Sequence, residues 1–202
     1  MNLLDGKLTS ETLLTEMRSQ VSELRQQHGV TPGLAVVLVG EDPASQVYVR
    51  NKVRTAKELG INSWQHTLPR ATTQAELLAV VRGLNEDPAV HGILVQSPPP
   101  PQIDERAIIE TLDPAKDVDC FHPVSVGRLT IGDEDGFLPC TPHGVMVLLQ
   151  RHKVATAGKL AVILGRSNIV GKPLALLLSR KGAGADCTVM ICHSRTPDLG
   201  HF

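Results

Sequence analysis

Aromatic residues are scarce in this chain: they make up 2% of its 202 residues, with one Trp, one Tyr and three Phe. Proteins that bind single-stranded nucleic acid stack bases on aromatic side chains, so the sequence offers little for that mode of binding. Excess positive charge is lacking too, since Lys and Arg total 20 against 21 Asp and Glu, a net charge of −1. Without it there is no electrostatic case for binding nucleic acid or an acidic membrane surface. We therefore expect the ligand to be a small molecule.

Long apolar runs are also missing. Although 42% of the residues are hydrophobic, no run approaches the roughly 20 residues that a membrane-spanning helix needs. The N-terminus shows no basic stretch followed by an apolar core, which is the pattern of a secretory signal. The sequence therefore predicts a cytoplasmic protein that does not enter a membrane.

Cysteine is sparse, with four residues in the chain, and in the cytoplasm these are expected to be reduced thiols. Cys120-x-His122 and Cys140-x-x-His143 could be drawn as a zinc site. The long gap between the two halves and the flanking prolines favour small buried cysteines instead. We therefore expect no metal.

Short apolar runs alternate with helical patterns along most of the chain. The runs that predict strands are 33–40, 61–68, 90–96, 160–164 and 186–192, and the segments that predict helices are 10–28, 42–59, 73–86, 104–112 and 141–152. Residues 113–136 have no clear period and are predicted to be irregular. The alternation predicts an α/β protein with parallel sheets, and the break near residues 139–142 is the expected domain boundary.

The clearest binding signal is the turn after the fourth predicted strand, Gly165-Arg-Ser-Asn-Ile-Val-Gly171. At such a strand–turn–helix junction, backbone N–H groups and the positive end of the helix dipole face outward together, which suits a phosphate. Five residues separate the two glycines, so the spacing is not the usual G-x-G-x-x-G, and a tight connection without a ligand stays open. Ser194, Arg195 and Arg166 favour NADP, because an NAD site uses a carboxylate where NADP sites use basic groups.

A second group of polar residues falls at the carboxyl ends of the other predicted strands, where ligands of open α/β sheets bind. Tyr48 and Lys52 are one helical turn apart and share a face; a solvated surface pair is the alternative. Gln96 ends a strand, and Asp117 and Asp119 alternate around a valine; a polar terminator and a solvated loop are their alternatives. Because all of these residues fall at the carboxyl ends of strands, a shared ligand-binding site is favoured. A Tyr-x-x-x-Lys pair also marks short-chain dehydrogenases, but there it follows the dinucleotide-binding loop. Here Tyr48 and Lys52 precede the binding turn by more than a hundred residues, so the chain does not match that family.

The residues match a known family in six blocks that keep the family's order, at 39–45 with 48–52, 92–96, 114–119, 139–144, 165–173 and 192–196. The chain resembles the bifunctional methylenetetrahydrofolate dehydrogenase/methenyltetrahydrofolate cyclohydrolase family. This resemblance implies that Tyr48 stacks on the folate rings and that Asp119 hydrogen-bonds the pterin edge. It implies that Lys52 is the key catalytic group, oriented by Gln96.

The resemblance also implies a folate-binding catalytic domain at 1–140 and a Rossmann-like NADP-binding domain at 141–202. Arg166, Ser194 and Arg195 would hold the NADP phosphate, and Thr141 would lie in the cleft between the domains. The implied cofactor-binding residues together are Thr141, Gly165, Arg166, Ser167, Ile169, Gly171, His193, Ser194 and Arg195. The family further implies a homodimer that serves one-carbon metabolism, including purine biosynthesis.

The chain departs from the family pattern at three places. Four prolines follow Ser97 where leucines are usual, and Cys120 stands where glycine is usual, at a strain cost of about 1 kcal/mol if its φ is positive. The sequence stops at Phe202, part-way through the Rossmann-like domain, so we expect a C-terminally truncated member. An inactive remnant that acts only as a folate-binding or dimerisation module is the alternative, and an unrelated NADP-binding reductase is a third possibility.

Overall fold

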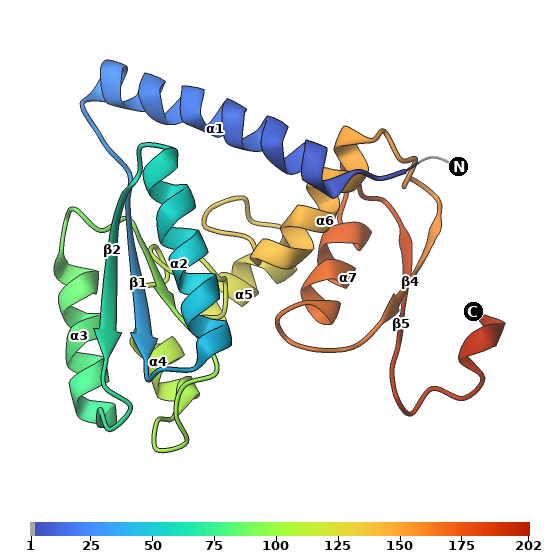
Figure 1. Ribbon diagram of the computed structural model, residues 1–202. Coiled ribbons are helices and arrows are strands. Elements are labelled where there is room, and N and C mark those ends of the chain that lie inside the picture. Colours follow the sequence, from blue (N-terminus) through green and yellow to red (C-terminus); the bar gives the residue numbers. More distant parts are fainter. Residues whose placement is uncertain (1–2) are drawn as a thin grey trace. The chain divides into compact units, whose positions relative to one another are not determined.

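The computed structural model describes residues 3–202, which form seven α-helices, five β-strands and one short 3-10 helix (Figure 1). The strands pair in parallel, in one sheet of three and another of two. The predicted α/β class with parallel sheets is confirmed. The residues pack as two compact units: a first unit of residues 10–118, and a second unit of residues 119–202 together with residues 3–9. Residues 119–139 thus pack with the second unit, although the sequence suggested a break near residue 140.

In the first unit, the central strand β1 (Gly33–Val39) lies between β2 (Asn62–Leu68) and β3 (Gly92–Val95). Side chains alternate across a strand, so the apolar run of β1 can bury one side chain after another only if both faces of the sheet are covered. Helices α2 (Pro43–Glu58) and α3 (Gln74–Glu86) lie on opposite faces (Figure 1). This is why the strand reads as an uninterrupted apolar run.

Two buried clusters follow from that arrangement. The cluster on the α3 face also contains residues of α4 (Glu105–Thr111), and its members are Ala35, Val37, Val39, Leu77, Val81, Leu84, Val90, Ile93, Ile103, Ile108 and Leu112. The cluster on the α2 face is smaller, and its buried members are Val36, Leu38, Val49 and Leu94. Each fully buried aliphatic side chain contributes about 1.5–3 kcal/mol to folding. The helices that carry the site residues therefore rest on a firmly packed sheet.

Helix ends in the first unit match their sequence signals. The Asp42 side chain accepts from the backbone N–H of Ser45 at 2.8 Å, with Pro43 in the first turn, and Thr73 and Glu76 form a capping box. Helix α1 (Gly6–His28) begins four residues earlier than the sequence indicated, at a turn where Asp5 accepts from the N–H of Leu8 at 3.0 Å. No helix within residues 3–202 is long and apolar enough to cross a membrane.

In the second unit, β4 (Leu160–Leu164) pairs with β5 (Thr188–Cys192), and α7 (Gly171–Ser179) connects them. Helix α6 (Cys140–Arg151) packs against α7. The buried core that these elements share with α5 (Pro123–Ile131) consists of Cys120, Leu129, Met146, Ile163, Leu177, Leu178 and Ala185. The predicted strand–turn–helix–strand order is confirmed, and it places the 165–170 loop at the carboxyl ends of both strands.

The prediction that residues 113–136 are irregular was wrong for part of that stretch. Residues Pro123–Ile131 form helix α5. Pro123 occupies the first turn, where a missing N–H costs nothing, and Nδ1 of His122 accepts from the N–H of Val124 at 3.1 Å. Gly132 ends the helix with φ 76°. The helix was overlooked because its interior contains glycine and several β-branched residues, which weaken a helical signal.

Two backbone positions are unusual. The Ser97–Pro98 bond is cis, and Cys120 has φ 58°. The cysteine at the usual glycine position therefore does adopt the left-handed conformation, at the cost of about 1 kcal/mol expected for a residue with a Cβ. Its side chain is 1% exposed and belongs to the core of the second unit, so burial of the thiol offsets part of that strain.

Candidate active site and cofactor loop

The first unit brings Lys52 and Gln96 together. Lys52 lies on α2 one turn after Tyr48, and Gln96 directly follows β3. The Lys52 ammonium donates to Oε1 of Gln96 at 3.4 Å, while Nε2 of Gln96 donates to the carbonyl of Ser97 at 2.7 Å. Because a carbonyl can only accept, the Ser97 contact defines which end of the amide faces Lys52. Both side chains are half-buried, which limits their motion.

Tyr48 presents its ring to solvent beside this pair. Tyr48 is 63% exposed and lies on the same face of α2 as Lys52. An exposed ring on a rigid helix is available for stacking on a flat ligand, since aromatic faces favour offset contacts with other π-systems. The helix face thus presents an aromatic ring and an amine next to each other, and a stacking role for Tyr48 stays a prediction.

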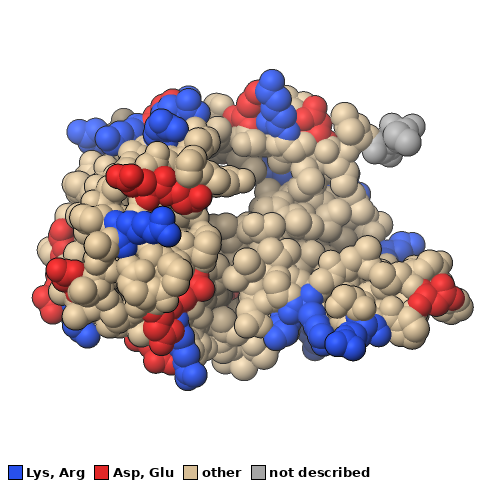
Figure 2. Space-filling view, turned by 60° about the horizontal axis from the view of Figure 1, so that its bottom comes forward, with Lys and Arg blue, Asp and Glu red and all other residues tan. Residues whose placement is uncertain are grey.

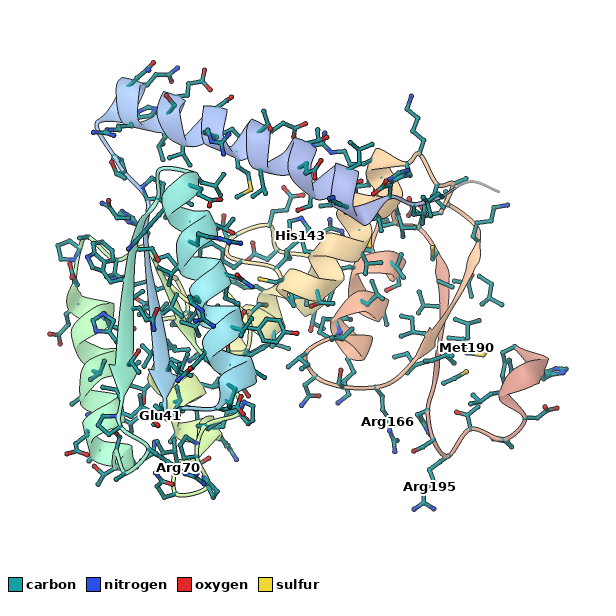
Figure 3. The ribbon with its side chains drawn as sticks, in the orientation of Figure 1. Glu41, Arg70, His143, Arg166, Met190 and Arg195 are labelled. Atoms are coloured by element: carbon teal, nitrogen blue, oxygen red, sulfur yellow. The ribbon has the colours of Figure 1, made fainter. Side chains whose placement is uncertain are left out.

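The proline loop after Gln96 is tied to the neighbouring strand–helix connection. Nε2 of Gln102 donates to the carbonyls of Arg70 and Thr72, at 2.6 and 3.2 Å. Glu41 and Arg70 lie beyond the carboxyl ends of the strands, at the same edge of the sheet (Figure 3). The prolines provide no N–H groups for a ladder, so these side-chain contacts hold the loop instead. Gln102 was not singled out from the sequence, because nothing local marks its partners.

Asp117 and Asp119 differ in their surroundings. Asp117 is 1% exposed and forms an isolated parallel bridge with Ile93 of β3. Asp119 is half-buried, and its Oδ1 accepts from the thiol of Cys140 at 3.9 Å in the second unit. Asp119 is the less buried of the two residues, so of the two it is better suited to contact a ligand.

In the second unit, the loop after β4 is shaped by its glycines and by Ser167. Gly165 has φ 133°, and a Cβ placed on Gly171 would lie 2.2 Å from the carbonyl oxygen of Gly165. The hydroxyl of Ser167 accepts from the N–H groups of Val170 and Gly171, at 3.1 and 3.3 Å. We expected the N–H groups of this turn to face outward, but those two are used inside the loop. Ser167 thereby fixes the start of α7.

The end of β5 forms a second tight turn beside that loop. The N–H of His193 donates to Oγ1 of Thr196 at 2.9 Å, and Nδ1 of His193 accepts from the N–H of Arg195 at 3.1 Å. Thr196 was not identified as a site residue from the sequence. Its hydroxyl stabilises the turn that carries Ser194 and Arg195.

The two turns border an open pocket of about 360 Å³, and the residues that line it are Leu164, Gly165, Arg166, Cys192, His193, Ser194 and Leu199. Arg166 and Arg195 both extend away from the sheet on the same side of the unit (Figure 3). Lys and Arg side chains gather on the surface of this unit (Figure 2). Within residues 3–202 neither arginine is in an ion pair, so both guanidinium groups are free for an anionic ligand.

The remaining predicted cofactor residues lie near this loop or on α6. Ile169 is 52% exposed within the loop. Thr141 is exposed in the first turn of α6, whose N-cap is Pro139 rather than Thr141. The close approach of Gly171 to Gly165, the pocket and the two free arginines fit a dinucleotide with an additional phosphate. No group of three or more His, Cys, Asp or Glu side chains suited to a metal ion occurs within residues 3–202.

Comparison with known proteins agrees with both halves of this description. Residues 4–119 match the profile of the tetrahydrofolate dehydrogenase/cyclohydrolase catalytic domain, and residues 139–202 match that of its NAD(P)-binding domain. The bifunctional protein FolD of Magnetococcus marinus is 56% identical over 198 residues, which are 98% of this chain and 68% of the relative. The chain thus corresponds to about two thirds of the length of its relatives.

Solved structures give the same result. The bifunctional FolD enzyme of Campylobacter jejuni superposes with a TM-score of 0.94 at 47% identity, over 100% of this chain and 70% of that one. The dehydrogenase-cyclohydrolase of Trypanosoma brucei, solved in complex with NADP cofactor and an inhibitor, superposes with a TM-score of 0.87 at 39% identity, over 96% and 64% of the two chains. This chain therefore belongs to the tetrahydrofolate dehydrogenase/cyclohydrolase family.

Proposed function

We propose that this protein oxidises methylenetetrahydrofolate to methenyltetrahydrofolate with NADP and then hydrolyses the methenyl product to formyltetrahydrofolate. The observation that carries the proposal is the Lys52–Gln96 pair: an ammonium 3.4 Å from an amide oxygen whose orientation the Ser97 carbonyl fixes. The pair lies at the carboxyl edge of a parallel sheet, where ligands of such sheets bind. Membership of the family supports the assignment of both reactions.

In the oxidation step the one-carbon bridge of the folate gives up a hydride, and bound NADP would supply the hydride acceptor. The protein contributes alignment, because two flat rings must meet at van der Waals distance. We assign the stacking surface for the folate to Tyr48 and the contact with the pterin edge to Asp119. Arg166, Ser194 and Arg195 hold the phosphate of the cofactor, and the loop that Ser167 and Gly171 shape carries its backbone contacts.

The hydrolysis step needs a proton acceptor. Water adds to the methenyl carbon and loses one proton to give a neutral carbinol. The carbinol hydroxyl then loses its proton while the departing nitrogen gains one, and cleavage of that carbon–nitrogen bond gives the formyl product. Lys52 in its neutral form accepts the proton that the water loses, and Gln96 holds the amine in place without adding a negative charge. A carboxylate at position 96 would instead keep the lysine protonated.

We further propose that the protein acts in the cytoplasm as a homodimer and that its formyl product serves purine biosynthesis. The family resemblance supports these points. Light scattering on the purified chain tests the homodimer: a mass of twice 21.7 kDa is expected, and a monomer would contradict it.

The activity itself is tested by one assay of the purified chain with methylenetetrahydrofolate and NADP, which follows NADPH and the methenyl intermediate together. Turnover with NADP, and much weaker turnover with NAD, is expected. A folded sample that binds tetrahydrofolate without turnover would overturn the enzyme assignment in favour of a folate-binding module. Reduction of unrelated ketones with no response to folate would favour another kind of reductase.

A further inference from the structure

Lys116 places its ammonium at the carboxyl end of α3, within the first unit. Nζ donates to the carbonyls of Leu84, Asn85 and Asp87, at 3.2, 2.7 and 2.8 Å. An ammonium has three donors, so these contacts use all of them. The last carbonyls of a helix carry partial negative charge and have no partner inside the helix, so a cation is stabilised there. Lys116 is therefore a tethered group and not a solvated surface charge.

A second tie joins the same helix end to the same segment. Nδ2 of Asn85 donates to the carbonyl of Thr111 at 2.7 Å, and its Oδ1 accepts from the N–H of Asp113 at 3.0 Å. Both polar ends of the amide are thus satisfied by backbone groups on either side of one turn. We call Asn85 and Lys116 the α3 clamp, because they hold residues 111–116 against the end of that helix.

The clamp determines how the next residues run along the sheet. The N–H of Ile93 in β3 donates to the carbonyl of Lys116 at 2.8 Å, and Asp117 bridges Ile93 in parallel. Val118 packs where Gly92 has no side chain: a Cβ on Gly92 would lie 2.4 Å from Cγ1 of Val118. Residues 116–118 therefore extend the sheet in a single register, and Asp119 is the residue that follows.

We propose that Lys116 is a positioning residue for the folate substrate: by fixing residues 116–118 on β3, it sets the direction in which the chain enters Asp119. The inference rests on the proposed function, in which the Asp119 carboxylate contacts the pterin. Lys116 does not touch the substrate. It acts because a hydrogen bond weakens steeply with a change in distance or angle, and because its three contacts at the end of α3 fix where residues 116–118 begin.

The test compares Lys116→Met with a matched control, Lys57→Met, which removes an exposed lysine from the last turn of α2. Binding of tetrahydrofolate and of NADP is measured by calorimetry on the full chain, in the wild-type background and in an Asp119→Asn background. We expect Lys116→Met to weaken tetrahydrofolate binding about tenfold in the wild-type background and less than about twofold in the Asp119→Asn background, since coupled residues are not additive. NADP affinity should be unchanged, and so should both affinities of Lys57→Met.

A structural role alone predicts a different pattern. If Lys116→Met lowers the unfolding temperature but leaves tetrahydrofolate affinity unchanged, or weakens binding equally in both backgrounds, the proposal is overturned. Should Lys116→Met not fold, Lys116→Arg supplies the test: its charge and donors are retained, and it should bind tetrahydrofolate more tightly than Lys116→Gln. Absence of tetrahydrofolate binding by the unaltered chain would overturn the proposed function itself, whereas normal binding with additive variants overturns only the role of Lys116.

Discussion

The ammonium of Lys52 lies 3.4 Å from Oε1 of Gln96, and Nε2 of the same amide donates to the carbonyl of Ser97. The amide therefore cannot rotate by half a turn without setting two donors against each other and leaving the Ser97 carbonyl without this partner. A neutral acceptor holds the lysine in place, yet it does not favour the charged form as a carboxylate would. This combination suits a lysine that must give up and take back a proton during turnover.

Lys52→Met keeps the length of the side chain and removes the proton acceptor. We expect cyclohydrolase activity to fall by at least about 100-fold, in the range attributed to general acid–base groups. NADP affinity should not change, because Lys52 and the cofactor loop belong to different units. Hydrolysis of added methenyltetrahydrofolate and calorimetry with NADP measure the two effects, and a loss of NADP affinity in this variant would count against the assignment.

Gln96→Glu separates the two roles of the amide. The carboxylate would pair with Lys52 and hold it protonated, and hydrolysis should fall about tenfold or more, as expected for a new hydrogen bond between charged groups. Gln96→Met removes the acceptor without adding charge, so its loss should be smaller than that of Gln96→Glu. Hydrolysis of added methenyltetrahydrofolate by both variants gives the comparison, and equal losses would show that Gln96 acts by orientation alone.

The free guanidinium groups of Arg166 and Arg195 predict the choice of cofactor. Arg195→Ala should weaken NADP binding about tenfold, the scale of one hydrogen bond between charged groups, and should affect NAD less than about twofold. Arg166→Ala is also expected to weaken NADP binding more than NAD binding. Arg82→Ala, which removes an exposed arginine from α3, serves as the control. A parallel loss for NADP and NAD would place the arginines elsewhere than at the additional phosphate.

Most of the fold could be predicted because its signals are local. The buried run of β1, the Asp42–Pro43 start of α2 and the Thr73–Glu76 capping box each lie within a few residues, and each is present in the structure. Helix α5 was not predicted because Gly127 and its β-branched neighbours lower helix propensity. The helix forms because Leu129 packs into the core of the second unit and stabilises it.

The site could be predicted only in part, for a physical reason. The spacing of Tyr48 and Lys52 sets their shared helix face, so it was accessible from the sequence. The contact between Lys52 and Gln96 joins residues 44 positions apart, and the amide orientation depends on the Ser97 carbonyl. No local period encodes such contacts. The roles assigned to Asp119 and to the cofactor residues come from the resemblance and stay predictions.

The close approach of Gly171 to the backbone of Gly165 shapes the cofactor loop, and a substitution at Gly171 tests it. A Cβ there would lie 2.2 Å from the carbonyl oxygen and 2.7 Å from the carbonyl carbon of Gly165, both backbone atoms that cannot rotate away. Gly171→Ala should cost about 1–3 kcal/mol of stability by overpacking and should weaken NADP binding. In α3, a Cβ on Gly83 would meet no atom within 4 Å, so Gly83→Ala should stabilise by about 0.5–1 kcal/mol. Urea unfolding of both variants provides the measurement, and equal midpoints would refute the crowding argument.

His143 on α6 predicts how stability depends on pH. Burial, and secondarily the nearby charge of Arg180, lower the pKa of His143 from its ordinary value of 6.5. The unfolded chain therefore takes up a proton at this residue at a higher pH than the folded chain, so stability is lost as pH falls below about 7 toward the folded pKa. Hydrogen bonds from Ser45 and Thr73 lower the pKa values of Asp42 and Glu76, so stability is lost there too, but at a pH below their ordinary values of 3.8 and 4.5.

The two effects are separated by their pH windows. Between pH 7.5 and 5.5, we expect the unfolding free energy of the wild type to decline more steeply than that of His143→Gln, which cannot take up a proton. Arg180→Gln should reduce the slope, since the positive charge that opposes protonation of His143 is then gone. Urea unfolding at half-unit pH steps gives the three curves. Parallel curves for wild type and His143→Gln would mean that His143 has the same pKa in the folded and unfolded chains.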